Sequence, residues 1–257
     1  MWDPAQYLRY GDERARPFLD LLARVGATGP RYVVDLGCGP GGLTASLLDR
    51  WPGASVDGVD NAPEMIEQAA KRAVAGRLAF GLGDVRDWRP PRPVDVLVAN
   101  ATLQWVPGHI TLLPQLVAWL APGGWFAMQV PGNFSSPSHT SLRDLRLSPR
   151  WRHRVGDEAD RHLAVGEPAE YVEALAGLGC RVDVWETTYT HVLPGDDAVL
   201  EWMRGTGLRP VLARLDEAEQ EEFLAEYGAA LRRAYPRRPY GIPYPFRRIF
   251  AVAARAA

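Results

Sequence analysis

Cysteine and histidine are scarce in this sequence, and long apolar runs are absent. Its 257 residues include 2 cysteines, Cys38 and Cys180, and 5 histidines that are scattered along the chain. Neither set has the spacing of metal ligands or of a disulfide framework, so we expect no metal site and a reduced, cytoplasmic location. No apolar run approaches the ~20 residues that span a bilayer, and no basic segment followed by an apolar one opens the chain as a secretory signal would.

The charge balance gives no reason to expect a nucleic-acid partner. Acidic and basic residues nearly cancel, at a net charge of -2, whereas nucleic-acid-binding surfaces carry an excess of basic residues. An apolar fraction of 47% with 23% charged residues is ordinary for a globular protein. We therefore expect one domain over residues 1–257 with no membrane or nucleic-acid partner, and the oligomeric state stays open.

Apolar runs alternate with helical patterns over the first half of the chain. This alternation predicts an α/β fold with a mostly parallel sheet and helices on both faces. The expected strands are residues 31–36, 55–60, 77–82, 94–100 and 125–130. The expected helices are residues 42–50, 62–73 and 110–120, with a helix stop and tight turn at 121–124. Residues 28–131 would thus form a ligand-binding core.

The alternation ends after residue 130. The later segments are expected to be a loop at 131–138, a helix near 168–177, and strands at 181–192 and 246–254. Residues 194–245, between those two strands, have the pattern of a helical insertion. Its expected helices are 196–204 and 216–234, the second with Asp216 as a plausible N-cap.

A glycine-dense turn follows the first expected strand. Asp35 lies at the end of a β-branched apolar run, and Gly37, Gly39 and Gly42 come after it. Bare backbone, a carboxylate and a helix N-terminus then surround one small volume, where a nucleotide-like ligand can be held. The same glycines satisfy the dinucleotide pattern G-x-G-x-x-G. The turn alone therefore leaves open a dinucleotide or an adenosyl sulfonium.

Acidic residues around the turn favour the sulfonium. A carboxylate at Asp35 would repel a pyrophosphate by on the order of several kcal/mol, but it can reach the amino group of a methionine-like moiety. Asp60 ends the second strand, where a carboxylate can accept from both ribose hydroxyls; the alternative is a helix N-cap. Asp84, after the third strand, can accept from an adenine amine beside the Val85 amide; the alternative is an ordinary turn residue.

Polar residues also follow the fourth strand, where open α/β sheets bring ligand and reacting partner together. The Trp105 ring on that loop can attract a sulfonium through its π-face, and the alternative is a core-filling side chain. The complete set of expected cofactor-binding residues is Asp35, Gly37, Gly39, Asp60, Asn61, Met65, Asp84, Val85, Asn100, Gln104 and Trp105.

The glycine turn, Asp60, the acid after the third strand and segment 120–124 together resemble class I S-adenosylmethionine-dependent methyltransferases. The resemblance implies that S-adenosyl-L-methionine is the cofactor. It also implies that Asp35, Asp60 and Asp84 contact its methionine, ribose and adenine respectively. The implied fold is a Rossmann-like sheet of seven mostly parallel strands with the last strand antiparallel, which matches 246–254.

Further segments resemble, in their order and spacing, the trans-aconitate 2-methyltransferase family. They are residues 2–4, 7–8, 13–17, 100–105, 185–189, 206–210 and 246–253. This resemblance implies methyl transfer to one carboxylate of a small anionic polycarboxylate, giving a monomethyl ester. A carboxylate is already a nucleophile at neutral pH, so no catalytic general base is expected. Tyr7 and Tyr10 are expected either to cap the cofactor pocket or to pack their own helix.

A substrate with several carboxylates needs cationic and amide donors over the ends of the fourth and fifth strands. Arginine suits this role because its planar fork binds carboxylates bidentately. Arg209 and Arg248 lie in the family-like segments and are the first choice, Arg247 is a further candidate, and the alternative for each is a solvated surface residue. The expected substrate-binding residues are Asn133, His139, Arg143, Arg204, Arg209, Tyr244 and Arg248, with the insertion 194–245 as a lid over them.

Two other functions stay open on the sequence. A different methyltransferase of the same fold would act on another acid or on a natural-product hydroxyl. A non-catalytic protein of the same fold would sense S-adenosylmethionine or regulate a partner. A dehydrogenase is disfavoured by Asp35 and by the Pro-Gly-Gly turn at 122–124.

Overall fold

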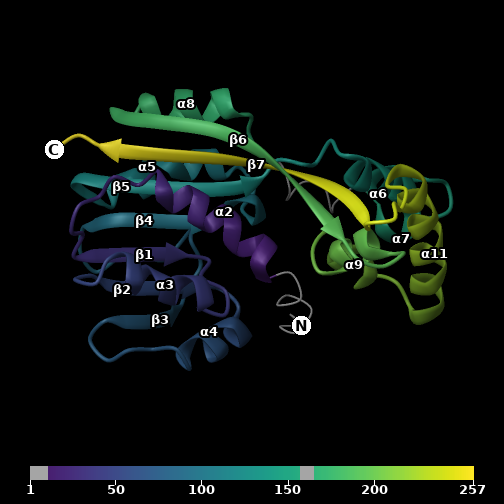
Figure 1. Ribbon diagram of the computed structural model, residues 1–257, viewed down its shortest axis with the longest axis horizontal. Coiled ribbons are helices and arrows are strands. Elements are labelled where there is room, and N and C mark those ends of the chain that lie inside the picture. Colours follow the sequence, from purple (N-terminus) through teal and green to yellow (C-terminus); the bar gives the residue numbers. More distant parts are fainter. Residues whose placement is uncertain (1–10, 157–164) are drawn as a thin grey trace.

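The computed structural model describes residues 11–156 and 165–257. A sheet with helices on both faces forms one part, and a helical body lies at the end where the two longest strands leave the sheet (Figure 1). The strands are β1 (Tyr32–Leu36), β2 (Ser55–Asp60), β3 (Leu78–Leu82), β4 (Val94–Asn100), β5 (Leu120–Pro131), β6 (Cys180–Leu193) and β7 (Ile242–Arg255). The helices beside the sheet are α2 (Gly11–Ala23), α3 (Gly42–Arg50), α4 (Pro63–Ala70), α5 (Leu113–Ala118) and α8 (Pro168–Ala176), with 3₁₀ turns η1 (Leu103–Trp105) and η2 (His109–Leu112).

The sheet has the strand order β3-β2-β1-β4-β5-β7-β6. Strands β1 to β5 pair in parallel, and β7 runs antiparallel to both of its neighbours, β5 and β6. The predicted seven-stranded, mostly parallel sheet with an antiparallel last strand is therefore confirmed. The strand order changes direction between β1 and β4, and ligand-binding crevices form outside the carboxyl ends of strands at such a point.

Two predicted segments of the first half differ from the structure. The helix expected at 110–120 is divided into η2 and the short α5, whose first turn contains Pro114, a residue that lacks the N–H needed to continue a preceding helix. The turn expected at 121–124 is an irregularity inside β5, where Gly123 adopts a φ of 73°. Both differences lie at the edge of elements whose type was predicted correctly.

Apolar cores on the two faces of the sheet hold the strands in place. On one face, Phe126 of β5 packs with Leu116 of α5 and Tyr171 of α8. On the other face, Phe18 of α2 and Leu47 of α3 pack against the sheet. Each of these side chains is at most 1% exposed, and full burial of one such residue stabilises the fold by about 1.5–3 kcal/mol. The strand ends are thus fixed relative to one another.

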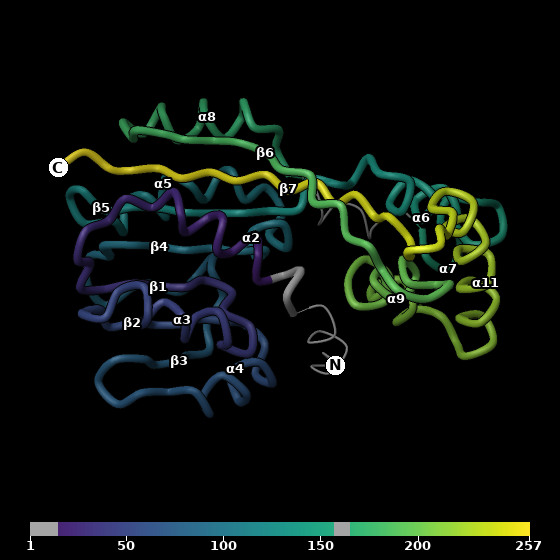
Figure 2. Tube along the Cα trace, viewed as in Figure 1, coloured from purple at the N-terminus to yellow at the C-terminus, as the bar shows by residue number. Residues whose placement is uncertain are grey.

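The helical body consists of α6 (Pro137–Leu147), α7 (Arg152–Val155), α9 (Ala198–Arg204), α10 (Arg209–Leu212) and α11 (Glu217–Ala234). Figure 2 shows β6 and β7 continuing from the sheet into this body. Its core includes the buried side chains of Trp202, Phe223 and Tyr227. The segment expected as an insertion supplies α9 to α11, and α6 packs against α11 as well. Among the described residues, no helix is long and apolar enough to cross a membrane.

Candidate active site

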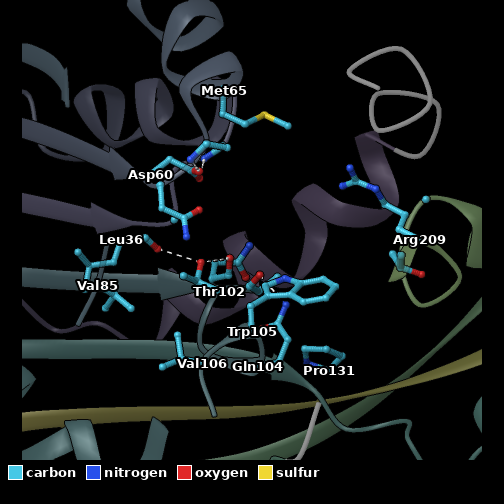
Figure 3. A pocket seen from close by; sticks show the side chains of 18 of the residues that line it. Leu36, Asp60, Met65, Val85, Thr102, Gln104, Trp105, Val106, Pro131 and Arg209 are labelled. Atoms are coloured by element: carbon cyan, nitrogen blue, oxygen red, sulfur yellow. Dashed lines mark hydrogen bonds between the residues drawn. The ribbon is translucent and has the colours of Figure 1, made fainter. Parts of the chain in front are cut away.

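A cavity of about 670 Å³ lies between the carboxyl ends of the parallel strands and the helical body. Figure 3 shows Asp60 and Met65 on one side of it, Arg209 on the opposite side, and Trp105 between them. Fourteen of the predicted site residues line this cavity: Gly37, Gly39, Asp60, Asn61, Met65, Asp84, Val85, Asn100, Gln104, Trp105, Asn133, His139, Arg209 and Arg248. The cavity therefore joins the two predicted sets of residues, one from the sheet and one from the body.

The glycine turn after β1 packs tightly against the loop that follows β4. Gly37 has a φ of 73°, and a Cβ atom built on it would overlap the Thr102 side chain. The Thr102 hydroxyl donates a hydrogen bond to the Leu36 carbonyl at 2.9 Å. Only glycine combines this left-handed conformation with so close an approach. Thr102 also lines the cavity; it lies in the family-like segment 100–105 but was not among the predicted site residues.

Asp60 joins the end of β2 to the glycine turn. One carboxylate oxygen accepts from the Gly39 N–H at 2.9 Å, and the other accepts from the Ala62 N–H at 2.9 Å, just before α4. The N-cap alternative is wrong, since Ala62 is the N-cap of α4 and no side chain caps the helix, whereas Asp60 lines the cavity. A carboxylate has about four acceptor positions, so these two bonds leave capacity for ligand hydroxyls.

Asp35 differs from its prediction. It does not line the cavity; it is 3% exposed and accepts a hydrogen bond of 2.6 Å from the Thr44 hydroxyl of α3. Burial raises the pKa of the Asp35 carboxyl to about 7, although the bond from Thr44 acts in the opposite direction. The expected direct contact with a ligand amino group is therefore not what this geometry provides. Asp35 instead fixes α3 behind the glycine turn.

Replacing Asp35 with asparagine should change how stability depends on pH. An ordinary aspartate ionises near 3.8 and the folded Asp35 near 7, so the folded state holds an extra proton between these values. Wild-type stability from this group is full below about pH 4 and is lost as pH rises through 7. Relative to wild type, Asp35→Asn should gain up to about 4 kcal/mol in unfolding free energy between pH 4 and pH 8. Urea unfolding at both pH values measures this, and a pH-independent difference would contradict it.

Asp84 lies on the cavity wall with its carboxylate bound by Arg86. The Arg86 guanidinium donates through Nε at 2.8 Å and through Nη2 at 2.7 Å, and the Arg86 backbone N–H donates at 2.9 Å. These bonds hold the pKa of Asp84 well below its usual range. Asp84 thus acts as a turn residue, as the alternative expected. An adenine amine bound here would share the Asp84 carboxylate with Arg86. Arg86 also lines the cavity and was not predicted.

The loop after β4 presents acceptor atoms. Ala101 is the one non-glycine residue with positive φ, 53°, among the described residues. Its N–H donates to the Gln129 carbonyl at 2.9 Å, and its carbonyl accepts from Gln104 Nε2 at 2.6 Å. Gln104 Oε1 and Asn100 Oδ1 are buried without a hydrogen-bond partner in the described part of the chain. Buried acceptors without partners are rare, so these two fit a ligand that carries N–H or O–H donors.

Trp105 lies at the mouth of the cavity rather than in a core. It is 45% exposed, which excludes the core-filling alternative. Its ring stands between the Asp60 side and the Arg209 side of the cavity (Figure 3). A ring in this place can contact a cationic ligand group through its π-face.

Two further arginines line the cavity. Arg248 of β7 is 6% exposed, its Nη1 donates to Gln129 Oε1 at 3.0 Å, and its Cζ lies 4.7 Å from the centre of the Phe246 ring. Arg209 stands at the start of α10. Asp60 and Asp84 line the opposite, sheet side. The cavity thus has the Asp60 carboxylate on one side and the Arg209 guanidinium on the opposite side (Figure 3), with Arg248 beside Gln129 at the sheet.

Three predicted substrate residues do not line the cavity. Arg143 and Arg204 approach carboxylates of their own helices, Asp144 at 3.8 Å and Glu201 at 3.5 Å. Tyr244 is 0% exposed and belongs to the core of the helical body, where burial raises the pKa of its hydroxyl. Tyr7 and Tyr10 lie outside the described residues.

Arg247, the further candidate, also lies away from the cavity. Its side chain binds Glu167 and Glu186, each with an Nη2–O distance of 2.5 Å. Consecutive residues of a strand point to opposite faces of the sheet, so β7 brings Arg248 to the cavity and Arg247 to the other face. Within residues 11–156 and 165–257, no three His, Cys, Asp or Glu side chains form a group that could hold a metal ion.

Comparisons with known proteins identify relatives of this chain. A methyltransferase-domain model matches residues 33–124. A trans-aconitate 2-methyltransferase of Streptomyces avermitilis is 55% identical over 262 residues, which cover 100% of this chain and 97% of that protein. The enzyme of the same name from Streptomyces coelicolor is 54% identical, covering 99% of this chain and 86% of that protein.

A solved structure supports the fold independently. Phosphoethanolamine N-methyltransferase 2 of Haemonchus contortus, in complex with S-adenosyl-L-methionine, superposes with a TM-score of 0.57 at 18% identity. The match covers 94% of this chain and 53% of that one. At this identity the likeness concerns the fold alone.

Proposed function

Since this chain belongs to the trans-aconitate 2-methyltransferase family, we propose that it transfers a methyl group from S-adenosylmethionine to a carboxylate of trans-aconitate. The observation that carries the proposal is the division of one cavity into two ends. Asp60 and the acceptors of Asn100 and Gln104 lie on the sheet side, Arg209 of α10 lies on the opposite side, and Arg248 of β7 lines the cavity beside Gln129 of β5. A cationic nucleoside and a polyanion match these ends by charge.

The residues at the sheet end fit the cofactor. The turn around Gly37 and Gly39 lets a ligand approach bare backbone, and the Asp60 carboxylate has acceptor capacity for ribose hydroxyls. Asn100 Oδ1 and Gln104 Oε1 are buried acceptors suited to an ammonium or amine. When bound, S-adenosylmethionine supplies an electrophilic methyl group on a sulfonium.

The residues at the body end suit a substrate with three carboxylates. Arg209 and Arg248 each offer a planar donor fork, and bidentate arginine–carboxylate pairs fix orientation as well as charge. Two carboxylates bound in this way would leave the third directed toward the sheet end. That carboxylate needs no general base, because it is already ionised at neutral pH. The protein's contribution is then to align the nucleophilic oxygen with the methyl group.

The helical body would act as the lid of this site. Residues 194–245 supply α10 and Arg209, and residues 28–131 supply the cofactor end, so a bound substrate would lie between these two parts of the single domain. Enclosure between them would exclude water from the reacting groups. Asn133 and His139, which line the same end, would contribute further polar contacts.

The test is an acceptor panel with methyl-labelled S-adenosylmethionine. We expect label to enter trans-aconitate with the highest kcat/KM. Dicarboxylates, which have no carboxylate for one of the two arginines, should give a lower kcat/KM, and alcohols and amines should not be labelled. Labelling of alcohols or amines alone would favour a different methyltransferase of this fold. Tight cofactor binding with no transfer to any acceptor would favour a non-catalytic regulator.

A further inference from the structure

Gln129 is a buried polar residue near the end of an interior strand of the sheet. It lies on β5 between Asn100 of β4 and Phe250 of β7, and it is 0% exposed. Its neighbours on β5 are the apolar Met128 and Val130, which are equally buried. Burying an amide costs free energy unless its hydrogen bonds are made. A buried glutamine here therefore requires a specific reason.

The side chain of Gln129 supports the cavity arginine of β7. Gln129 Oε1 accepts the hydrogen bond of 3.0 Å from Arg248 Nη1. The Phe246 ring holds the same guanidinium from one side, at 4.7 Å from Cζ. A hydrogen bond in the guanidinium plane and a ring against its face together define the orientation of the plane. The bond to Gln129 engages the Nη1 donor of the guanidinium.

The Gln129 side chain that binds Arg248 is uncharged, whereas the side chains that bind the adjacent Arg247 are carboxylates. Arg247 is bound by the two carboxylates of Glu167 and Glu186, which offset its charge, and it lies off the cavity. An amide orients a guanidinium without adding a negative charge beside it. The positive charge that attracts a substrate carboxylate is therefore not reduced by Gln129.

The amide nitrogen of Gln129 argues against a purely structural role for this residue. Gln129 Nε2 is buried and has no hydrogen-bond partner in the described part of the chain. An unsatisfied buried donor is destabilising, and an apolar side chain of similar size would avoid that cost. The bond to Arg248 is the contact that an apolar residue could not replace.

We propose that Gln129 is a positioning residue for the acceptor: its neutral amide directs Arg248 toward a substrate carboxylate and preserves the charge of the guanidinium. This rests on the proposed function. Gln129 does not line the cavity, so its effect on substrate binding passes through Arg248. Its backbone carbonyl also accepts from Ala101, and a side-chain substitution leaves that bond in place.

Gln129→Glu tests the proposal, because it keeps the shape and places a carboxylate against Arg248. We expect the KM for trans-aconitate to rise at least tenfold, kcat to stay within threefold, and the Kd of S-adenosylhomocysteine to stay within twofold. Gln129→Met removes the hydrogen bond without adding charge, and its KM should rise by a smaller factor, about threefold. Glu186→Gln, on the opposite face beside Arg247, is the matched control and should leave KM unchanged.

Thermal unfolding of each variant accompanies the kinetics. An unchanged KM in both Gln129 variants would overturn the proposal, and so would a parallel loss of cofactor affinity, kcat and melting temperature, which a structural role predicts. If Gln129→Glu does not fold, Gln129→Met decides by the same split between KM and kcat. A wild-type protein that does not methylate trans-aconitate would instead contradict the proposed function.

Discussion

Replacing Asp60 with alanine should weaken S-adenosylmethionine binding at least about 100-fold. Hydrogen bonds to a charged group contribute about 1.5–3 kcal/mol each, and we expect this carboxylate to accept from two ribose hydroxyls. The same substitution removes the bonds that Asp60 accepts from Gly39 and Ala62, while the backbone bonds from Gly37 and Cys38 to the Val59 carbonyl still tie the glycine turn to β2. Titration calorimetry of wild type and variant with the cofactor measures the ratio.

Asp57→Asn is the matched control for Asp60→Ala. Asp57 lies on the same strand but off the cavity, where it accepts a hydrogen bond of 2.6 Å from the Tyr32 hydroxyl. Asparagine can still accept that bond, so cofactor affinity should be unchanged. Equal cofactor affinity in the Asp60 variant and wild type, with both proteins folded, would remove the ribose role from Asp60.

Arg209→Ala should raise the KM for trans-aconitate by at least about 30-fold while the Kd of the cofactor stays the same. The reason is the loss of one charged, bidentate partner for a substrate carboxylate, and truncating such a pair costs about 2–5 kcal/mol when it is shielded from solvent. Arg209→Lys should give an intermediate KM, since an ammonium keeps the charge but not the planar fork. Steady-state kinetics with varied trans-aconitate and saturating cofactor distinguishes the three proteins.

Arg143→Ala supplies the control for Arg209. Arg143 has a half-exposed side chain, 3.8 Å from Asp144, and does not line the cavity. Its removal should leave the KM for trans-aconitate unchanged. An Arg209 variant with the same KM as the Arg143 variant would show that Arg209 does not bind the acceptor.

The sheet and the cofactor end could be predicted because their signals are local. Glycine residues, strand-ending acids and β-branched runs act within a few positions of one another, and parallel strands bring their carboxyl ends to one edge. Asp60 and Asn100 therefore meet in one cavity as their positions in sequence indicated. Asp35 shows the limit of this reasoning, because Thr44, nine residues later, takes up its carboxylate inside the fold.

The acceptor end could be predicted in part: Arg209 and Arg248, the first choices, line the cavity, whereas Arg143 and Arg204 do not. Arginine was expected there, but the choice between Arg247 and Arg248 depends on which face of β7 meets the cavity. That face is set by pairing with β5 and β6, which lie far away in sequence. Gln129 had no signal for the same reason: its partner Arg248 is 119 residues away. Arg143 and Arg204 found partners on their own helices instead.

Carbon-13 NMR of the product formed by the wild-type protein tests most directly whether the protein methylates a carboxylate. The protein is incubated with trans-aconitate and S-adenosylmethionine labelled in its methyl group. We expect one labelled methyl ester that mild alkali hydrolyses, formed on a single carboxyl group as the proposed binding of the other two by Arg209 and Arg248 requires. A labelled methyl group that resists alkali, or no transfer by protein that binds the cofactor, would contradict carboxylate methylation.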